Sequence, residues 1–178
     1  MPRRPAFLAN APSLPADEPQ YDTYRVVTDS TGAYSFQVPS DWDQQLSESG
    51  STMVASDFAN FLGSELEPGL FSVGSPVLGG WDADLFIDLI NAESERASNP
   101  CEEVSRRNFV NAGLDGRVQV QSCLGGDIVR VNLAVANAAR EHLVHISFKL
   151  VDERDYEVAG RVVDTFFLMD PSLLPGLE

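Results

Sequence analysis

Two cysteines, Cys101 and Cys123, flank a pair of segments whose apolar and polar residues alternate as in a β-hairpin. If the hairpin loop centres on Ala112, the two cysteines lie directly opposite each other, at a separation that a disulfide spans. If the loop tip is at 114–116 instead, the register shifts by several residues. Cys101 and Cys123 would then be two small apolar residues with no relation to each other. Two thiols do not complete a structural zinc site, and the redox motif C-x-x-C is missing. The spacing therefore predicts a disulfide between Cys101 and Cys123.

The only two histidines, His142 and His145, fall in one predicted strand. Because side chains alternate along a strand, we predict that they point to opposite faces and cannot share a metal ion. A serine hydrolase would need one of them as its base, and no G-x-S-x-G motif accompanies them. The sequence also lacks the dinucleotide, P-loop, zinc-protease and EF-hand motifs. We therefore predict no catalytic residue, no metal site and no cofactor.

Carboxylates gather on two predicted helices, where paired acids could act as general acid and base or could hold calcium. Helix capping and a solvated helix face account for the same positions, because negative charge stabilises a helix N-terminus. We favour this structural interpretation, and an enzyme that uses paired carboxylates is our third functional hypothesis. The residues are Asp82, Asp84, Asp88, Asp152, Glu153 and Asp155.

Alternation in three predicted neighbouring strands places branched apolar residues on one sheet face and polar residues on the other. The apolar set is Val118, Val120, Val129, Val131, Val144 and Ile146. The polar set is Arg117, Gln119, Gln121, Arg130, Asn132, His145, Ser147 and Lys149. Such a locally basic face could bind an anion or an acidic partner. The alternative is a sheet face that is solvated or covered by a loop.

The chain is acidic, with 27 Asp and Glu against 12 Lys and Arg and a net charge of −15. This balance disfavours binding to nucleic acid and to anionic membranes, since both are negatively charged. Solubility explains the charge more simply than a specific cationic partner does. No stretch approaches the ~18 consecutive apolar residues of a membrane span. We therefore expect no transmembrane segment in this chain.

Composition predicts one domain, at 22–170. Residues 1–21 are rich in Pro and Ala without periodicity, so we expect a flexible leader or linker, and 171–178 is expected to be a C-terminal tail. The leader lacks the apolar core of a signal peptide, and such a segment could tether the domain to an upstream part of a longer protein.

The first half of the domain reads as short strands. Alternation predicts a hairpin of 24–29 and 33–38, with turn residues between the strands, and further strands at 51–56 and 69–74. Residues 57–62 indicate a helical turn. Four more strands, joined by turns too short for crossover helices, are expected to be antiparallel neighbours. They span 102–110, 116–123, 127–136 and 141–150.

Two amphipathic helices complete the pattern, each with an aspartate at its expected N-cap. Asp82 caps the first, whose inner stripe is predicted as Leu85, Phe86, Leu89 and Ile90. Asp152 caps the second, whose inner face is predicted as Tyr156, Ala159, Val162, Val163, Phe166 and Phe167. Strands, a helix, a meander and a terminal helix together predict an α+β domain.

Residues 22–169 resemble the PsbP-like family, which includes the extrinsic photosystem II protein, the Ran-binding Mog-type proteins and many bacterial lipoproteins. The resemblance rests on Tyr34-x-Phe36-x-x-Pro39-x-x-Trp42 and on the turn from Gly113 to Gly116. It implies an antiparallel sheet of about six to seven strands sandwiched by helices. We interpret the first motif structurally: the proline ends a strand and the tryptophan folds back as a plug on the core.

The family resemblance also implies a binding or assembly module without shared catalytic residues. Together with a disulfide, which fits an oxidising compartment, it favours a bacterial extracytoplasmic module that is secreted or membrane-tethered. Such a module, lipoprotein-like or the sensor portion of a membrane protein, would recognise a protein or a small ligand. The alternative is a cytosolic protein-binding regulator of the Mog type, which reduced cysteines would favour.

Overall fold

A computed structural model of the chain describes residues 4–63, 66–77, 81–97, 100–111 and 114–174. Its main layer is a seven-stranded antiparallel sheet with the strand order β3-β4-β5-β9-β8-β7-β6, and a second sheet has the order β1-β2-β10. The strands are β1 (Tyr24–Thr28), β2 (Tyr34–Pro39), β3 (Gln44–Glu48), β4 (Ser51–Ala55), β5 (Gly69–Pro76), β6 (Glu102–Asn111), β7 (Leu114–Cys123), β8 (Ile128–Ala136), β9 (His142–Leu150) and β10 (Phe167–Leu168).

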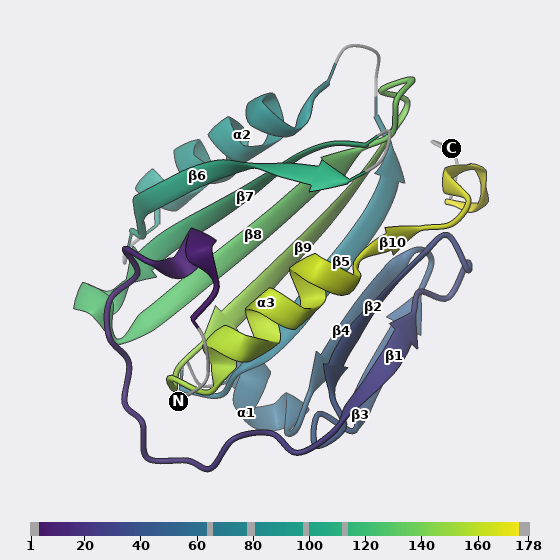
Figure 1. Ribbon diagram of the computed structural model, residues 1–178. Coiled ribbons are helices and arrows are strands. Elements are labelled where there is room, and N and C mark those ends of the chain that lie inside the picture. The colour runs from purple at the N-terminus through teal and green to yellow at the C-terminus, as the bar shows by residue number, and fades with distance from the viewer. Residues whose placement is uncertain (1–3, 64–65, 78–80, 98–99, 112–113, 175–178) are drawn as a thin grey trace.

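Helices cover both faces of the large sheet. The α-helices are α1 (Phe58–Gly63), α2 (Ala83–Glu95) and α3 (Asp155–Thr165), and the 3-10 helices are η1 (Ala6–Leu8), η2 (Leu124–Gly126) and η3 (Pro171–Leu173). Helix α2 packs on one face over β7 and β8, and α3 lies on the other face beside the β1–β2 hairpin (Figure 1). The predicted α+β sandwich is confirmed, and the small second sheet is an addition to it.

The β1–β2 hairpin supplies a large part of the core. Tyr34, Phe36 and Val38 alternate onto one face and are buried, as predicted. The Tyr34 hydroxyl lies 2.9 Å from Ser72 Oγ of β5, which ties the small sheet to the large one. Trp42 is also buried, and its indole nitrogen donates to the Tyr21 hydroxyl at 3.3 Å. The structural interpretation of Pro39-x-x-Trp42 is confirmed.

The β6–β7 hairpin places the two cysteines opposite each other in a disulfide, with their Cα atoms 4.3 Å apart. Near the loop, Asn111 pairs with Leu114, so β7 already contains Leu114 and the alternative tip at 114–116 is wrong. Continued along the hairpin without interruption, this pairing would place Cys101 one residue away from Cys123. A bulge between Glu103 and Ser105 shifts the register by one residue and brings the two cysteines opposite each other. Gly113 of the second motif lies outside the described residues.

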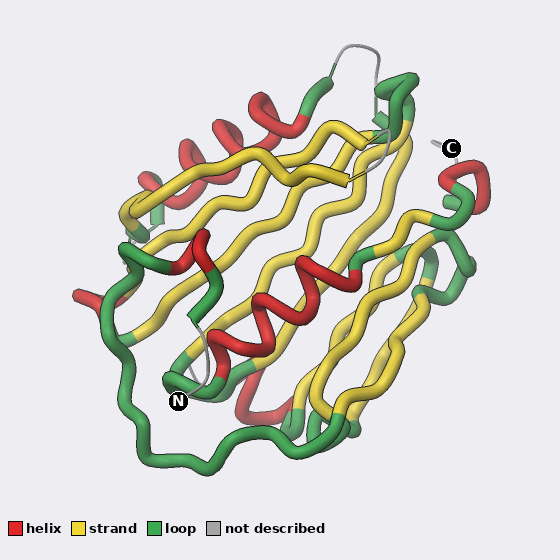
Figure 2. The backbone as a smooth tube through the Cα atoms, viewed as in Figure 1, coloured by secondary structure: helices red, strands yellow, loops and turns green. Residues whose placement is uncertain are grey.

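Residues 4–21, hereafter the leader, differ from the expected flexible linker. Leu8, Ala11, Leu14 and Tyr21 are all buried against the domain. Figure 2 shows the leader as a long loop that leaves η1 beside β6 and continues to β1. In the expected tail, η3 forms and Leu174 is buried in the main core. The apolar side chains of these two segments do not follow a helix or strand period. They are nevertheless buried against the domain, although most of the backbone that carries them is irregular.

The predicted inner faces of the two main helices are largely confirmed, with three residues wrongly placed. Asp82 caps α2 by accepting the Leu85 N–H at 2.9 Å, as expected. The expected Phe86 and Ile90 pack beside the buried Ala83 and Ile87, whereas Leu85 and Leu89 are more than 40% exposed. In α3 the expected inner residue Phe167 is 59% exposed, because the helix has ended and the chain has entered β10.

The prediction that Asp152 is the N-cap of α3 is also wrong. The helix begins at Asp155, and Arg154 occupies the N-cap position. Asp152 accepts the Arg154 N–H at 3.0 Å in the preceding turn. The Asp155 carboxylate reaches back to the N–H groups of Val151 and Asp152, at 2.9 and 3.0 Å. This carboxylate is buried, and burial raises its pKa against the lowering effect of these hydrogen bonds.

Candidate functional site

The polar residues predicted to share a sheet face do so, and α2 covers the middle of that face. Gln119, Gln121 and Asn132 are buried, and with Asn91 of α2 they form what we call the amide ladder. Asn132 Nδ2 donates to Oε1 of both glutamines, at 2.9 and 3.2 Å. Both glutamines donate to Asn91 Oδ1, at 2.6 and 3.0 Å. The ladder therefore positions α2 on the sheet and is closed to a partner in this structure.

Charged groups terminate the amide ladder at one end. Glu103 Oε2 accepts hydrogen bonds from Asn91, Gln119 and Arg106. Burial alone would raise the pKa of Glu103, but these three donors outweigh it and hold the pKa below its ordinary value. Arg106 continues the chain to Asp88 at 2.8 Å. The ladder thus ends in an ion-pair network at the β6 side of α2.

At the other end, His145 Nε2 lies 3.1 Å from Asn132 Oδ1, and the imidazole packs 5.0 Å from the Phe86 ring of α2. Burial, with a smaller contribution from the charge of Arg130, lowers the pKa of His145 to about 4. The imidazole is therefore neutral at pH 7. It acts as a packing group beneath α2.

The cationic members of the predicted face lie around the amide ladder. Arg117 pairs with Asp84 at 2.6 Å and with Asp115 at 3.0 Å. Arg130 and Lys149 are direct cross-strand partners on β8 and β9, and Lys149 Nζ donates to the Phe61 carbonyl at 3.1 Å. Both side chains are half-buried. A binding role for this set stays a prediction, now restricted to its rim.

The candidate catalytic carboxylates serve structural contacts. Asp82 caps α2, Asp84 pairs with Arg117, and Asp88 pairs with Arg106. Among the described residues, no group of three or more His, Cys, Asp and Glu side chains could hold a metal ion. No helix in this part of the chain is long and apolar enough to cross a membrane.

On the opposite face of the sheet, the leader is fastened to the start of α3. Each residue from Asp152 to Tyr156 bonds to it. The hydrogen bonds join Asp152 to Asp17, Glu153 to Arg4, Leu14 and Pro15, Arg154 to Pro19, Asp155 to Tyr21, and Tyr156 to Pro12. The Arg4 guanidinium also lies 4.3 Å from the Tyr156 ring centroid. These contacts make the leader a fixed wall of the domain.

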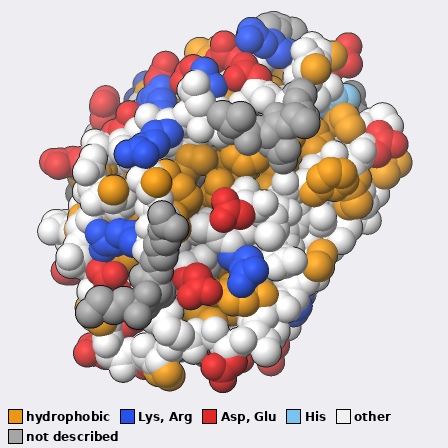
Figure 3. All heavy atoms as spheres, viewed as in Figure 1, with side chains coloured by type: hydrophobic (Ala, Val, Ile, Leu, Met, Phe, Trp, Pro, Cys, Tyr) orange, Lys and Arg blue, Asp and Glu red, His pale blue; other side chains and the backbone are white. Residues whose placement is uncertain are grey.

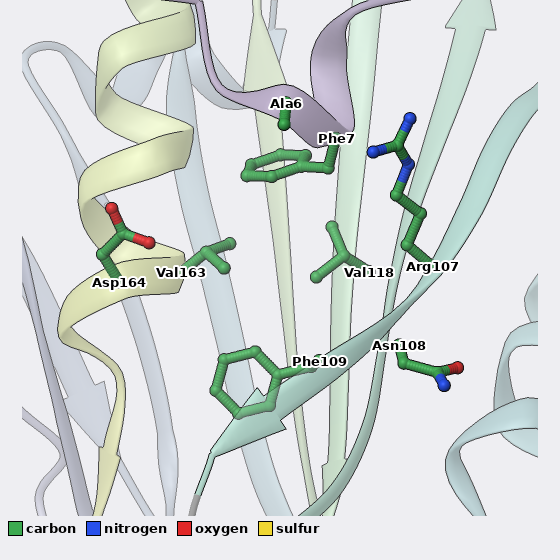
Figure 4. A pocket seen from close by; sticks show the side chains of 8 residues that line it. All are labelled: Ala6, Phe7, Arg107, Asn108, Phe109, Val118, Val163 and Asp164. Atoms are coloured by element: carbon green, nitrogen blue, oxygen red, sulfur yellow. The ribbon is translucent and has the colours of Figure 1, made fainter.

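Between this wall, β6 and α3 is an open hollow of about 450 Å³, which we call the groove (Figure 4). Five apolar side chains line it: Ala6 and Phe7 of η1, Phe109 of β6, Val118 of β7 and Val163 of α3. Figure 3 shows hydrophobic side chains exposed in a hollow on this side of the molecule.

Polar groups lie at the margins of the groove. Arg107 and Asp164 stand on opposite sides of it, both exposed (Figure 4). Neither forms an ion pair with a described residue. A second hollow of about 430 Å³ adjoins the groove, since Ala6 and Asp164 line both, and it continues along α3 past Gly160 and Arg161. The arrangement suits an elongated ligand with an apolar body and a charged end.

Sequence reasoning missed the groove because it treated the leader as a linker. The groove joins residues from four separate segments, whose proximity no local pattern reveals. One signal was available: Phe7, Leu8 and Leu14 are large apolar residues in a segment otherwise typical of linkers. Leu8 is completely buried.

The sequence matches no family model, and no curated protein sequence matches it significantly. Solved structures do resemble it. Cyanobacterial PsbP (CyanoP) from Synechocystis sp. PCC 6803 aligns with a TM-score of 0.55 at 17% identity, over 83% of this chain and 93% of that one. The Ran-binding protein Mog1p of Saccharomyces cerevisiae aligns with a TM-score of 0.54 at 11% identity, over 86% and 99%. The chain therefore has the PsbP/Mog-like fold.

Proposed function

We propose that this chain is a non-catalytic binding module that acts outside the cytoplasm and holds its ligand in the groove. The observation that carries the proposal is the groove itself: a hollow with apolar walls and polar margins, a guanidinium among them, and no histidine, serine or cysteine among the described residues that line it. Hollows that combine apolar walls with a few polar groups are typical of ligand sites. Arg107 would select a ligand with an anionic end, since its guanidinium is free of ion pairs with the described carboxylates.

The similarity in fold favours neither compartment, because one similar structure is a cyanobacterial PsbP and another a yeast Ran-binding protein. The Cys101–Cys123 disulfide favours an oxidising compartment, since cytosolic thiols are normally kept reduced. A bacterial secreted or membrane-tethered protein is our proposal for the source of this chain, and the cytosolic regulator of the Mog type ranks second.

Titration with 8-anilinonaphthalene-1-sulfonate, an apolar ring system with one anionic group, tests the groove. We expect saturable binding with enhanced fluorescence. Val163→Trp should abolish it by filling the hollow, and Arg107→Gln should weaken it about tenfold, the effect of losing roughly 1.4 kcal/mol of a charge-assisted contact. Arg96→Gln, on the far side of the molecule after α2, is the matched control. Equal binding by all three variants would contradict the proposal.

Alkylation of thiols in protein taken directly from its native cells tests the compartment. We expect Cys101 and Cys123 to resist labelling until a reductant is added. Immediate labelling of both would overturn the extracytoplasmic assignment and move the cytosolic regulator to first place, without affecting the groove.

A further inference from the structure

The two edges of the seven-stranded sheet are protected to different degrees. At the β6 edge, a bulge interrupts the strand between Glu103 and Ser105, and η1 of the leader lies alongside, with Ser105 Oγ donating to the Phe7 carbonyl at 3.2 Å. Bulges, charges and a covering segment are the usual means by which proteins block an edge strand. The bulge and this contact make the β6 edge less regular than the β3 edge and less suited to further strand pairing.

The β3 edge has no bulge and no covering segment among the described residues, and its only charged residue is Glu48 at its end. Within the described residues, β3 forms a ladder with β4 alone. Its sequence, QQLSE, contains no proline, lysine or arginine, and its pairing with β4 is regular along all five residues. Four of these five residues are exposed. The N–H and C=O groups on the outer side of β3 are therefore free to pair with another strand.

An apolar strip leads from this edge across the sheet. Leu46, Met53 and Phe71 are direct cross-strand partners on β3, β4 and β5, and we call them the outer row. Leu46 is 55% exposed and Phe71 is 42% exposed. They lie on the sheet face that carries α2, but α2 packs over β7 and β8. On this half of the face, α1 lies over the end of β5, where Phe61 approaches Gly69, and it leaves Leu46 and Phe71 exposed. A strand added beyond β3 would extend the outer row and bury Leu46.

The charges around β3 select the kind of strand. Asp41 and Asp43 immediately precede it and Glu48 ends it, and all three are exposed. None forms an ion pair with a described Arg or Lys. The nearby Arg25 is engaged with Gln45 Oε1 and the Trp42 carbonyl, at 2.9 and 2.6 Å. A second copy of this chain, with net charge −15 and the same three carboxylates, is disfavoured by repulsion.

We propose that the β3 edge docks an extended segment of a protein partner, in which an apolar residue opposite Leu46 is flanked by Lys or Arg. The main-chain hydrogen bonds supply affinity, the outer row selects the apolar residue, and the acidic flanks select the basic ones. This surface is separate from the groove and goes beyond the proposed function. It adds a protein partner to the groove's ligand.

Two synthetic peptides of nine residues test the proposal: Lys-Thr-Lys-Thr-Val-Thr-Lys-Thr-Lys and its counterpart with Glu in place of every Lys. Each is titrated into the isotope-labelled full chain and followed by backbone amide NMR. With the basic peptide we expect shifts centred on 44–48, slower hydrogen exchange of the outward amides of β3, and weakening at high salt. With the acidic peptide we expect no shifts in β3.

A matched pair of variants locates the binding. Leu46→Lys replaces the exposed apolar residue of β3, and Leu85→Lys makes the same change on the outer surface of α2, where Leu85 is 44% exposed. We expect Leu46→Lys to reduce affinity for the basic peptide at least about tenfold and Leu85→Lys to leave it within about twofold. Amide spectra report whether each variant is folded.

Four results would overturn the proposal. Equal affinity for the basic and the acidic peptide would show that charge does not select the partner. Amide shifts centred on the groove, or equal losses of affinity in Leu46→Lys and Leu85→Lys, would show that the peptide binds somewhere other than β3. Hydrogen-exchange protection of β3 that rises with protein concentration in the absence of peptide would show that a second copy of the chain occupies this edge. None of these results bears on dye binding in the groove, so failure here is distinguishable from failure of the proposed function.

Discussion

The two faces of the large sheet are built from the same strands but are held in different ways. On the α3 side, Val118, Val120 and Val131 are buried in an apolar core. On the α2 side, their sequence neighbours Gln119, Gln121 and Asn132 are buried to the same extent within the amide ladder. Apolar contacts stabilise by area and are not directional, whereas amide hydrogen bonds fix the position of each group. A polar sheet face can thus be a packing surface.

The largest effect is expected on the apolar face. Phe148 of β9 is completely buried in the main core, and Phe148→Ala removes a large side chain and leaves a cavity. We expect a loss of about 4 kcal/mol in the free energy of unfolding, measured by denaturant titration. Phe71→Ala on the adjacent strand is the control and should cost less than about 1 kcal/mol, since Phe71 is 42% exposed. Similar losses would mean that the outer row is covered.

The next effect is expected from breaking the amide ladder. Asn132→Leu keeps the number and branching of the side-chain heavy atoms but removes the partner of Gln119, Gln121 and His145. We expect a loss of about 3 kcal/mol by denaturant titration, because buried polar groups left unpaired cost roughly 1–3 kcal/mol each. Ser147→Ala on the same face should change stability little. A neutral Asn132→Leu would show that α2 is held by its apolar residues alone.

A third effect comes from the titration of His145. Since its pKa falls from 6.5 to about 4 on folding, the unfolded chain takes up a proton at a higher pH than the folded chain. Its contribution to stability is therefore complete above pH 6.5 and is lost as pH falls from there toward 4. Between pH 7.5 and pH 5 we expect a loss of about 2 kcal/mol from this group.

Denaturant titrations at the two pH values check this expectation. His145→Gln should remove most of the difference, and His142→Gln, on the opposite face of the same strand, should preserve it. A pH dependence that is unchanged in His145→Gln would assign it to other groups.

The smallest effect concerns the leader on the apolar face. A Cβ at Gly160 of α3 would lie 2.6 Å from Pro5 Cγ, so Gly160→Ala must displace the leader. Alanine also favours the helix by up to about 1 kcal/mol, so the net change in stability should be small. We expect faster hydrogen exchange at Leu14, whose N–H donates to Glu153. Gly63→Ala, with open space around its Cβ, is the control. Unchanged exchange at Leu14 would show that Pro5 moves independently.

Local patterns were sufficient where a neighbouring strand or turn decides the structure. Alternation identified the β1–β2 hairpin and the meander, and the spacing of Cys101 and Cys123 identified their pairing although the tip and the bulge were not foreseen. β3 was missed because QQLSE has a single apolar residue, and its pairing with β4 supplies the stability that its own composition lacks.

The sequence by itself determined most of the elements, the antiparallel order of the β6–β9 meander, the disulfide and the division of the sheet into an apolar and a polar face. Each of these depends on the period of two residues along a strand or on contacts across a short turn. Only the tertiary structure decided which helix covers which face, that the leader forms one wall of the groove, and that the β3 edge is open. These features join segments far apart in the chain, so the shape and charge of the assembled surfaces, rather than any local periodicity, select them.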